Sequence, residues 1–160
     1  MSATDCYVDG YGCIVCPEVL ASPGAPAKTV TSNNPGWNAG ANSITVLDGD
    51  LHVVDALAAA PVDMYFGLKY SRAGVGAPFM LAYAFRIYSL AHTTVYEIWE
   101  GPQMRAAAAS YTLGATLEIR RVGGIVSYWA AGAQVYQSAV PSSGPLLVSA
   151  CLYSAGDSLP

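Results

Sequence analysis

Short stretches in which apolar and polar residues alternate, separated by turn residues, recur along the chain from Ser43 onward. A period of two residues is typical of strands with one buried face, and strands at regular spacing are typical of all-β sandwiches and barrels. The pattern predicts strands at about 44–47, 51–54, 62–70, 79–89, 93–100, 104–111, 115–122, 125–130, 134–138 and 146–153. We therefore expect an all-β fold, an antiparallel β-sandwich or jelly roll.

Two alanine runs have the propensity to form helices, but their surroundings argue against it. Pro61 directly follows the run Ala56–Ala60 and ends it. The run Ala106–Ala109 lies between strand-like neighbours, where we expect tertiary context to override propensity. Neither run changes the all-β prediction.

The clearest local pattern is a pair of hairpins between Thr116 and Ser138. In Leu117–Arg120 apolar and charged residues alternate, and Gly123-Gly124 then supplies two residues that accept a positive φ, as a tight turn requires. The returning strand 125–130 alternates again, and Ala131-Gly132 forms a second turn. This alternation places Val126 and Tyr128 on one face and Ser127 and Trp129 on the other. Trp129 points outward if Val126 and Tyr128 face the core, and the alternative is that Trp129 itself packs in a core.

This stretch, Leu117–Ser138, resembles the hairpin of concanavalin A-like, laminin-G-like jelly rolls, with its apolar-Glu-Ile-Arg strand, glycine turn and Val-x-Tyr-aromatic strand. Ser142–Tyr153 similarly resembles the closing strand of such domains. One departure is that Ala131-Gly132 stands where these hairpins usually have Asn-Gly. The resemblance implies a sandwich domain over residues 44–160.

The first 43 residues differ in composition from the rest and predict an extended N-terminal arm. Prolines at 17, 23, 26 and 35 fix φ and withhold backbone donors, which disfavours a central strand. The arm also lacks the charge of a solvated tail, so we expect it to lie on its own surface or on a neighbour's. We assign Trp37, Pro23, Pro26 and Pro35 as assembly contacts.

Together with Gly36–Ser43, this arm resembles the N-terminal parts of small structural proteins of tailed bacteriophages. That resemblance implies a non-enzymatic virion protein, either a head decoration or a fibre or tail component. Its partners would be other virion subunits and further copies of itself. Met1–Cys6 lacks a secretory signal, so synthesis in the host cytoplasm is expected.

The charge content supports assembly and excludes two classes of partner. Only 11% of the residues are charged and 53% are apolar, which is little charge for an isolated particle, so we expect other chains to cover part of the surface. A net charge of −4 without a basic stripe argues against nucleic-acid binding. The most apolar stretch, Pro78–Tyr88, is too short for a membrane helix and contains Arg86.

The cysteines leave their chemical state open between free thiols, a disulfide and a metal site. Cys13 and Cys16 have the spacing of half a zinc site, but no second pair accompanies them. Cys6 and Cys151 complete the set. A cytoplasmic origin favours reduced thiols over a disulfide, and we predict neither a metal nor a cofactor.

Candidate catalytic residues are few, and we expect no enzyme activity. Glu97 and Glu100 are three apart on one strand, so they should not share a face as a glycosidase pair must. Asp48 and Asp50 flank Gly49 in a predicted hairpin loop without the further ligands that calcium needs. Neither histidine has a triad around it: His52 falls on a strand and His92 in a turn.

Tryptophans supply the remaining functional candidates, because an exposed indole can stack on a sugar or anchor a subunit. We assign Trp129 and Trp99 as ligand-binding residues. The alternative to a structural role is therefore a carbohydrate-binding module that recognises a cell-surface glycan.

Overall fold

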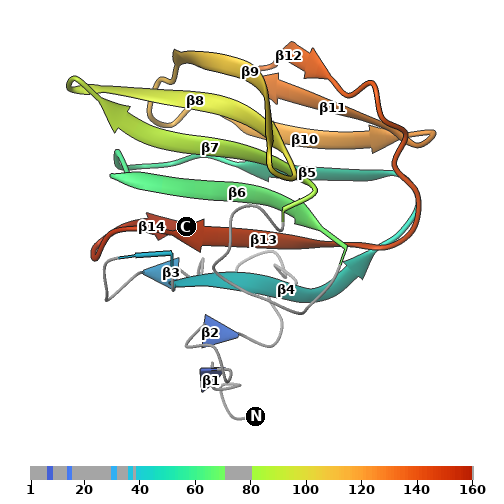
Figure 1. Ribbon diagram of the computed structural model, residues 1–160, viewed down its shortest axis with the longest axis horizontal. Helices are drawn as coiled ribbons and strands as arrows, with labels where there is room; N and C mark the ends of the chain where they lie inside the picture. The colour runs from blue at the N-terminus through green and yellow to red at the C-terminus, as the bar shows by residue number, and fades with distance from the viewer. Residues whose placement is uncertain are drawn as a thin grey trace.

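The computed structural model describes residues 7–8, 14–15, 30–31, 36–37, 39–70 and 81–159, which are built of antiparallel strands (Figure 1). In chain order these are β1 (Tyr7–Val8), β2 (Ile14–Val15), β3 (Val30–Thr31), β4 (Ala39–Leu47), β5 (Leu51–Asp55), β6 (Asp63–Lys69), β7 (Tyr83–Leu90), β8 (Thr93–Glu100), β9 (Gln103–Ser110), β10 (Leu117–Val122), β11 (Ile125–Ala130), β12 (Ala133–Gln137), β13 (Leu146–Leu152) and β14 (Ser158–Leu159). No helix that could cross a membrane occurs among these residues.

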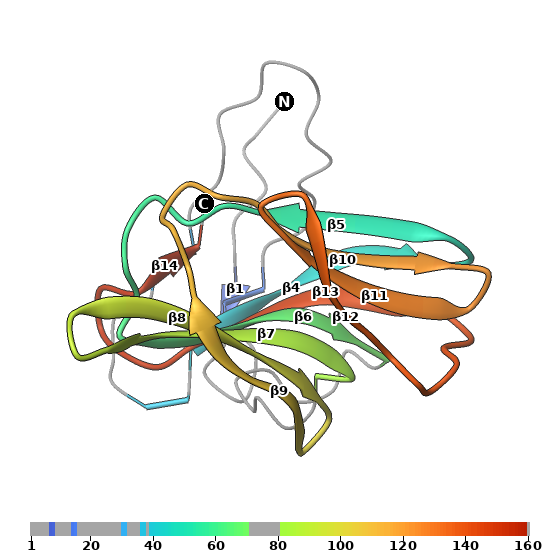
Figure 2. The same cartoon turned by 90° about the horizontal axis from the view of Figure 1, so that it is seen from above.

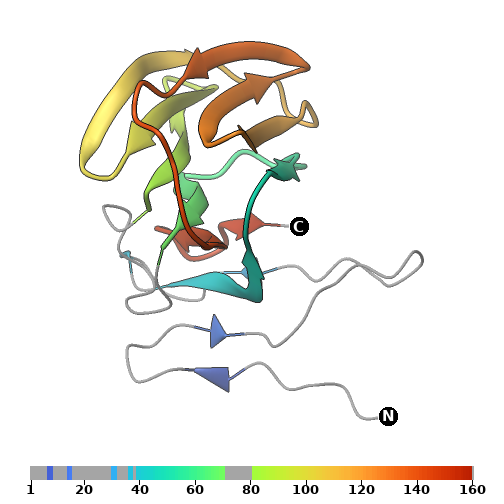
Figure 3. The same ribbon diagram turned by 90° about the vertical axis from the view of Figure 1, so that its right-hand side faces the viewer.

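Two sheets form the two layers of a sandwich, which confirms the predicted fold class (Figure 2). The larger sheet has six strands in the order β4-β13-β6-β7-β8-β9, and the smaller has four in the order β12-β11-β10-β5. Beyond them, β3 pairs with β14, while β1 and β2 form a hairpin that lies beside β4 (Figure 3).

The core lies between the sheets and is filled by the inward-facing residues of both. Phe85 of β7 packs edge-on against Tyr96 and Tyr128, at ring-centroid distances of 5.5 and 5.4 Å. Offset and edge-on aromatic pairs of this kind stabilise a core beyond the area they bury. Because Tyr128 comes from the small sheet and Phe85 from the large one, this contact joins the two layers.

The predicted hairpins are confirmed in detail. Val126 and Tyr128 are completely buried, and Leu117 and Ile119 face the same core. Both glycines of the first turn have positive φ, 57° at Gly123 and 80° at Gly124. The second turn has the same geometry, with a φ of 50° at Ala131.

Other strand boundaries differ from the prediction. The first long strand, β4, begins at Ala39 rather than at residue 44, because it pairs with β13 as far as the register Leu152↔Ala39. The run Ala106–Ala109 lies within β9, as expected from its neighbours. Residues 79–80 of the predicted strand 79–89 and the prolines of the predicted arm lie outside the described residues. The division of the chain at residue 43 stays a prediction.

One end of the sandwich is held by a buried guanidinium. Arg121 is only 2% exposed, its Nε donates to the carbonyl of Gly49 at 2.6 Å and its Nη1 donates to the carbonyl of Gly144 at 2.7 Å. The backbone N–H of Gly123 donates to Asp50 Oδ1 at 2.8 Å. These bonds connect the loop before β5, the turn after β10 and the loop before β13.

One edge strand of each sheet is irregular. Register shifts interrupt the pairing of β9 with β8 and that of β12 with β11, so each of these edge strands carries extra residues. Bulges at a sheet edge increase the local twist and hinder the addition of a strand from another chain. The other edge of the smaller sheet, β5, pairs with β10 without a register shift.

Candidate functional site

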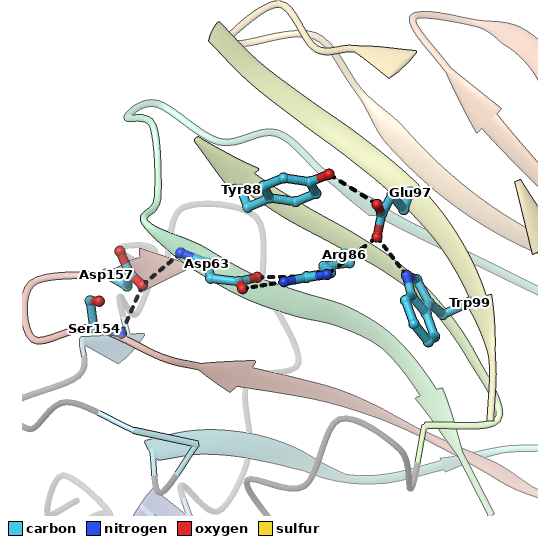
Figure 4. A network of polar contacts seen from close by, with 7 residues as sticks. All are labelled: Asp63, Arg86, Tyr88, Glu97, Trp99, Ser154 and Asp157. Atoms are coloured by element: carbon cyan, nitrogen blue, oxygen red, sulfur yellow. Dashed lines mark hydrogen bonds and ion pairs between the residues drawn. The ribbon is translucent and has the colours of Figure 1, made fainter. Parts of the chain in front are cut away.

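Polar and aromatic side chains gather on the outer face of the six-stranded sheet, where β6, β7 and β8 lie side by side (Figure 4). Strand alternation puts them there, because their neighbours Phe66, Phe85 and Ile98 point into the core. The register Tyr65↔Arg86↔Glu97 aligns three of them in one row across the strands. We define the Arg86 cluster as Asp63, Tyr65, Arg86, Tyr88, Glu97 and Trp99.

Arg86 and Asp63 form a two-pronged ion pair. Nε of Arg86 donates to Asp63 Oδ1 at 3.0 Å, and Nη2 donates to Asp63 Oδ2 at 2.6 Å. Such bidentate pairs are stronger and more directional than a single charged hydrogen bond. The hydrogen bonds that Arg86 donates to Asp63, more than the charge of Asp63 alone, raise the pKa of Arg86 above its ordinary value.

Glu97 is the acceptor at the other side of Arg86. Its Oε1 accepts from the hydroxyl of Tyr88 at 2.9 Å, and its Oε2 accepts from Nε1 of Trp99 at 2.9 Å and from Nη1 of Arg86 at 3.4 Å. Three donors on three different side chains thus fix this carboxylate. The orientation of the Trp99 indole is set by the same bond.

Aromatic rings border the ion pairs. The guanidinium of Arg86 lies 4.6 Å from the ring centroid of Tyr88 and 5.8 Å from that of Tyr65, within the range of cation–π attraction. Tyr65 is in edge-on contact with Trp99 at 6.1 Å and with Trp37 at 5.3 Å. Burial raises the pKa of Tyr65 to about 12, so its hydroxyl is protonated at neutral pH.

Solvent reaches only part of this face. Tyr65, Ala84 and Cys151 are buried, with Trp37 packed against them, whereas the β9 side is open. Within the cluster the side chain of Arg86 is 28% exposed, that of Asp63 16% and that of Glu97 11%. The charged groups are therefore held in place by the protein but remain within reach of a ligand.

Asp157 fixes the edge of the cluster from the C-terminal side (Figure 4). Its Oδ1 accepts from the backbone N–H of Val62 at 2.8 Å, and its Oδ2 accepts from that of Ser154 at 3.0 Å. A longer bond of 3.4 Å joins Oδ2 to the backbone N–H of Asp63. The start of β6, and with it the ion pair to Arg86, is thus connected to the loop after β13.

The structure separates the two tryptophans assigned as ligand-binding residues. Trp99 belongs to the Arg86 cluster, whereas Trp129 points outward from the four-stranded sheet on the opposite side of the sandwich. The two cannot form one site. Trp37, assigned as an assembly contact, lies beside the cluster and packs against Tyr65 and Tyr153.

Trp129 is part of a separate polar face. Arg120 lies over its ring at 4.1 Å, and its Nε1 donates to Ser127 Oγ at 3.0 Å. Arg120 also pairs with Glu118, which accepts from His52 Nε2 at 2.7 Å. These hydrogen bonds, from Arg120 above all, lower the pKa of Glu118. Because Arg120 already covers the indole, this face offers a poorer stacking surface than the Arg86 cluster.

The remaining acidic candidates lie apart from one another. Glu97 is on the outer face, whereas Glu100 is buried and bonded to Arg105 Nε at 3.0 Å. Asp48 accepts from the backbone N–H of Gly49, which has a φ of 66°. The predicted hairpin is wrong, however, because β4 and β5 belong to different sheets and this loop passes from one sheet to the other.

Among the described residues, the two histidines and Cys151 form no common site either. His92 lies in the turn between β7 and β8, with a φ of 69°. No three metal-binding side chains come together within the described part of the chain. Cys151 is buried, while Cys6, Cys13 and Cys16, together with Pro23, Pro26 and Pro35, lie outside the described residues.

Sequence reasoning missed most of the cluster, namely Asp63, Tyr65, Arg86 and Tyr88. Alternation in Tyr83–Tyr88 marks Arg86 and Tyr88 as sharing a face, and this signal was present in the sequence. The pairing of β6 with β7 was not, because 23 positions separate Asp63 from Arg86.

Comparisons with known proteins find similar structures but no related sequence. No family model matches the chain, and no curated protein matches it. A Bacillus licheniformis beta-glucanase is 11% identical with a TM-score of 0.46, over 80% of this chain and 64% of that one. A lichenase from a mouse hindgut metagenome is 11% identical with a TM-score of 0.46, over 98% and 86%. The Caenorhabditis elegans galectin LEC-6 is 16% identical with a TM-score of 0.39, over 84% and 89%.

At these scores and identities the likenesses carry no argument about ligand or activity. The chain also spans less than two thirds of the length of the Bacillus enzyme.

Proposed function

We propose that the chain is a non-enzymatic glycan-binding domain whose ligand contacts the Arg86 cluster. The observation that carries this proposal is the combination of fixed charged groups and aromatic rings on one partly exposed sheet face. A sugar ring presents hydroxyl groups at its edge and C–H groups on its faces. The carboxylates of Asp63 and Glu97 and the unbonded N–H groups of Arg86 suit the hydroxyls, and Trp99 suits the apolar faces.

The rigidity of the cluster supports binding. Arg86, Tyr88 and Trp99 are mutually oriented through Glu97, so little side-chain freedom would be lost when a ligand binds. Binding sites commonly combine apolar surface with a few well-placed polar groups, and the Arg86 cluster has this composition.

The same contacts argue against glycoside hydrolysis. A hydrolase needs one protonated carboxylic acid beside a second carboxylate that acts as a base or nucleophile. Here Asp63 and Glu97 both accept hydrogen bonds from the guanidinium of Arg86, so neither is set apart as the acid. Binding without turnover is therefore the function proposed.

A glycan array probed with the purified protein and with two tryptophan variants tests this function. We expect wild type and Trp129→Ala to bind the same glycans. The affinity of Trp99→Ala for these glycans should be at least about tenfold lower, which is the loss expected for a stacked ring. Because Trp99 also packs against Tyr65, Tyr88→Phe and Arg86→Gln serve as further variants, each checked by thermal unfolding. Binding that persists without Trp99 and Arg86, but disappears in Trp129→Ala, would place the site on the other sheet.

A second candidate is a structural component of a phage virion, a decoration or a fibre or tail subunit, that assembles through its arm and apolar surfaces. The observation that favours it is the stretch Val122–Gly156, which contains no charged residue. Within it Val122, Ile125 and Val140 are at least half exposed. Such a surface offers nothing to repel a neighbouring subunit, and the two functions are compatible.

Size-exclusion chromatography with light scattering tests assembly. We expect a homo-oligomer for the full chain, and deletion of Met1–Asn34 should leave a folded β domain that no longer assembles. A monodisperse monomer of the full chain at all concentrations would contradict self-assembly.

A further inference from the structure

The Arg86 cluster holds more negative than positive charge. Asp63 and Glu97 contribute two carboxylates, and Arg86 is the basic side chain that contacts them among the described residues. The carboxylate of Asp157 lies next to Asp63 and is bonded to backbone N–H groups rather than to a cation. A ligand on this face therefore meets a net negative field.

Three of the five N–H groups of the guanidinium are already engaged within the cluster. Nε and Nη2 donate to Asp63, and Nη1 donates to Glu97. Proteins that recognise acidic groups commonly offer such a guanidinium as a two-pronged donor. Here Asp63 occupies the Nε–Nη2 edge, so an acidic ligand would have to displace Asp63 from that edge or use the one remaining N–H on each of Nη1 and Nη2.

The carboxylate oxygens of Asp63 can accept further hydrogen bonds from a ligand. Each oxygen of Asp63 accepts one bond from Arg86, and a carboxylate oxygen has room for about two. The side chain of Asp63 is 16% exposed, so the remaining positions can be reached. Hydroxyl groups are the donors that an uncharged sugar supplies in number.

Building on the proposed glycan-binding function, we propose that the Arg86 cluster selects uncharged glycans and discriminates against those that carry carboxylate groups. An acidic group on the ligand would lie against Asp63 and Glu97, whose two negative charges the guanidinium of Arg86 offsets only by half. Repulsion between like charges at contact distance should weaken binding at least about tenfold at low salt, and added salt should screen it.

Matched pairs of glycans test the selection. Soluble amylose, cello-oligosaccharides and galactan are each compared with the same glycan after oxidation of its C6 alcohols to carboxylates. Titration calorimetry at about 20 and about 300 mM NaCl covers weak and strong screening. In any pair that binds, we expect the neutral glycan to have the higher affinity. The ratio of its affinity to that of the oxidised glycan should fall as the NaCl concentration rises.

Two variants link this ratio to the cluster. Asp63→Asn and Glu97→Gln each remove one negative charge. We expect either variant to lower the ratio of the affinity for the neutral glycan to the affinity for its oxidised form. Asp48→Asn removes a carboxylate from an exposed loop outside the cluster and should leave the ratio unchanged. Thermal unfolding identifies any variant that has not folded. If one of the two cluster variants has not folded, the affinity ratio of the other is the test.

The outcomes separate the two proposals. If an oxidised glycan binds as tightly as its neutral partner or more so, and Arg86→Gln abolishes that binding, the charge selection is wrong although the glycan site is right. If none of the pairs and no array glycan binds, the proposed function itself falls, and the selection falls with it.

Discussion

Glu97 and Glu100 lie three positions apart on β8 and project from opposite faces of the six-stranded sheet. Glu97 joins the Arg86 cluster on the outer face, and Glu100 lies on the core side with its Oε2 on Arg105, while both residues are 8% exposed. The face on which each lies, and not its exposure, places Glu97 beside a ligand on the Arg86 cluster and Glu100 away from it.

This difference predicts opposite results for two matched variants. Glu97→Gln should weaken glycan binding several-fold because it alters the acceptor of Trp99, Tyr88 and Arg86. Glu100→Gln should leave affinity unchanged and affect only the free energy of unfolding. Both are measured by calorimetry and urea unfolding, alongside an assay for released reducing sugar. Turnover by wild type that either variant abolishes would show that the chain is an enzyme.

The neighbouring residues Arg120 and Arg121 should differ in their importance for stability. Replacing Arg121 by Met leaves the carbonyls of Gly49 and Gly144 without their donor and should lower the free energy of unfolding by about 3 kcal/mol. Arg120→Met removes a more exposed ion pair and a ring contact, worth about 1 kcal/mol. If urea unfolding gives the same loss of unfolding free energy for both variants, the buried loop contacts of Arg121 contribute no more than the exposed contacts of Arg120.

Asp55 should make stability depend on pH. Burial raises its pKa from 3.8 to about 6, and its Oδ2 has no hydrogen-bond partner. The folded state thus holds the proton of Asp55 more tightly than the unfolded state does. Burial of the ionised carboxylate lowers the free energy of unfolding, and this cost is absent below about pH 4, grows as pH rises and is complete above about pH 6. Asp55→Asn should raise the free energy of unfolding by about 2 kcal/mol at about pH 8 and by little at about pH 3.5.

The matched control for this prediction is Asp48→Asn, in an exposed loop, for which no comparable pH-dependent gain is expected. A gain from Asp55→Asn that is the same at both pH values would mean that ionisation is not its cause.

The second hairpin turn should be open to improvement. Ala131 has a φ of 50°, a conformation that costs a residue with a Cβ about 1 kcal/mol and that asparagine tolerates better. Ala131→Asn should therefore raise the free energy of unfolding by about 0.5 to 1 kcal/mol. Ala133→Asn, two residues on within β12, is the control and should give no gain in thermal unfolding.

The sequence was most informative where structure is local. In Leu117–Ala130 the alternation of residues assigned both faces of two strands, and the glycine turn fixed their pairing, so Trp129 was correctly placed on the face opposite Val126 and Tyr128. Which of the two faces lies against the core was not predicted. The Arg86 cluster depends instead on which strands lie next to each other. Neither Asp63 nor Trp37 has a neighbour in the sequence that marks it as a partner of β7 or β6. Side-chain pairs made across a sheet are invisible until the strand order is known.

The stretch Val122–Gly156 contains no charged residue, and the buried guanidinium of Arg121 directly precedes it. Together these two features have a practical consequence. Arg121 is the last basic residue of the chain, so it is the last position that trypsin can recognise. In the folded protein that side chain is enclosed by three loops, and the protease cannot reach it until the sandwich opens. The rate at which trypsin releases the peptide that follows Arg121 therefore measures how often the whole domain opens.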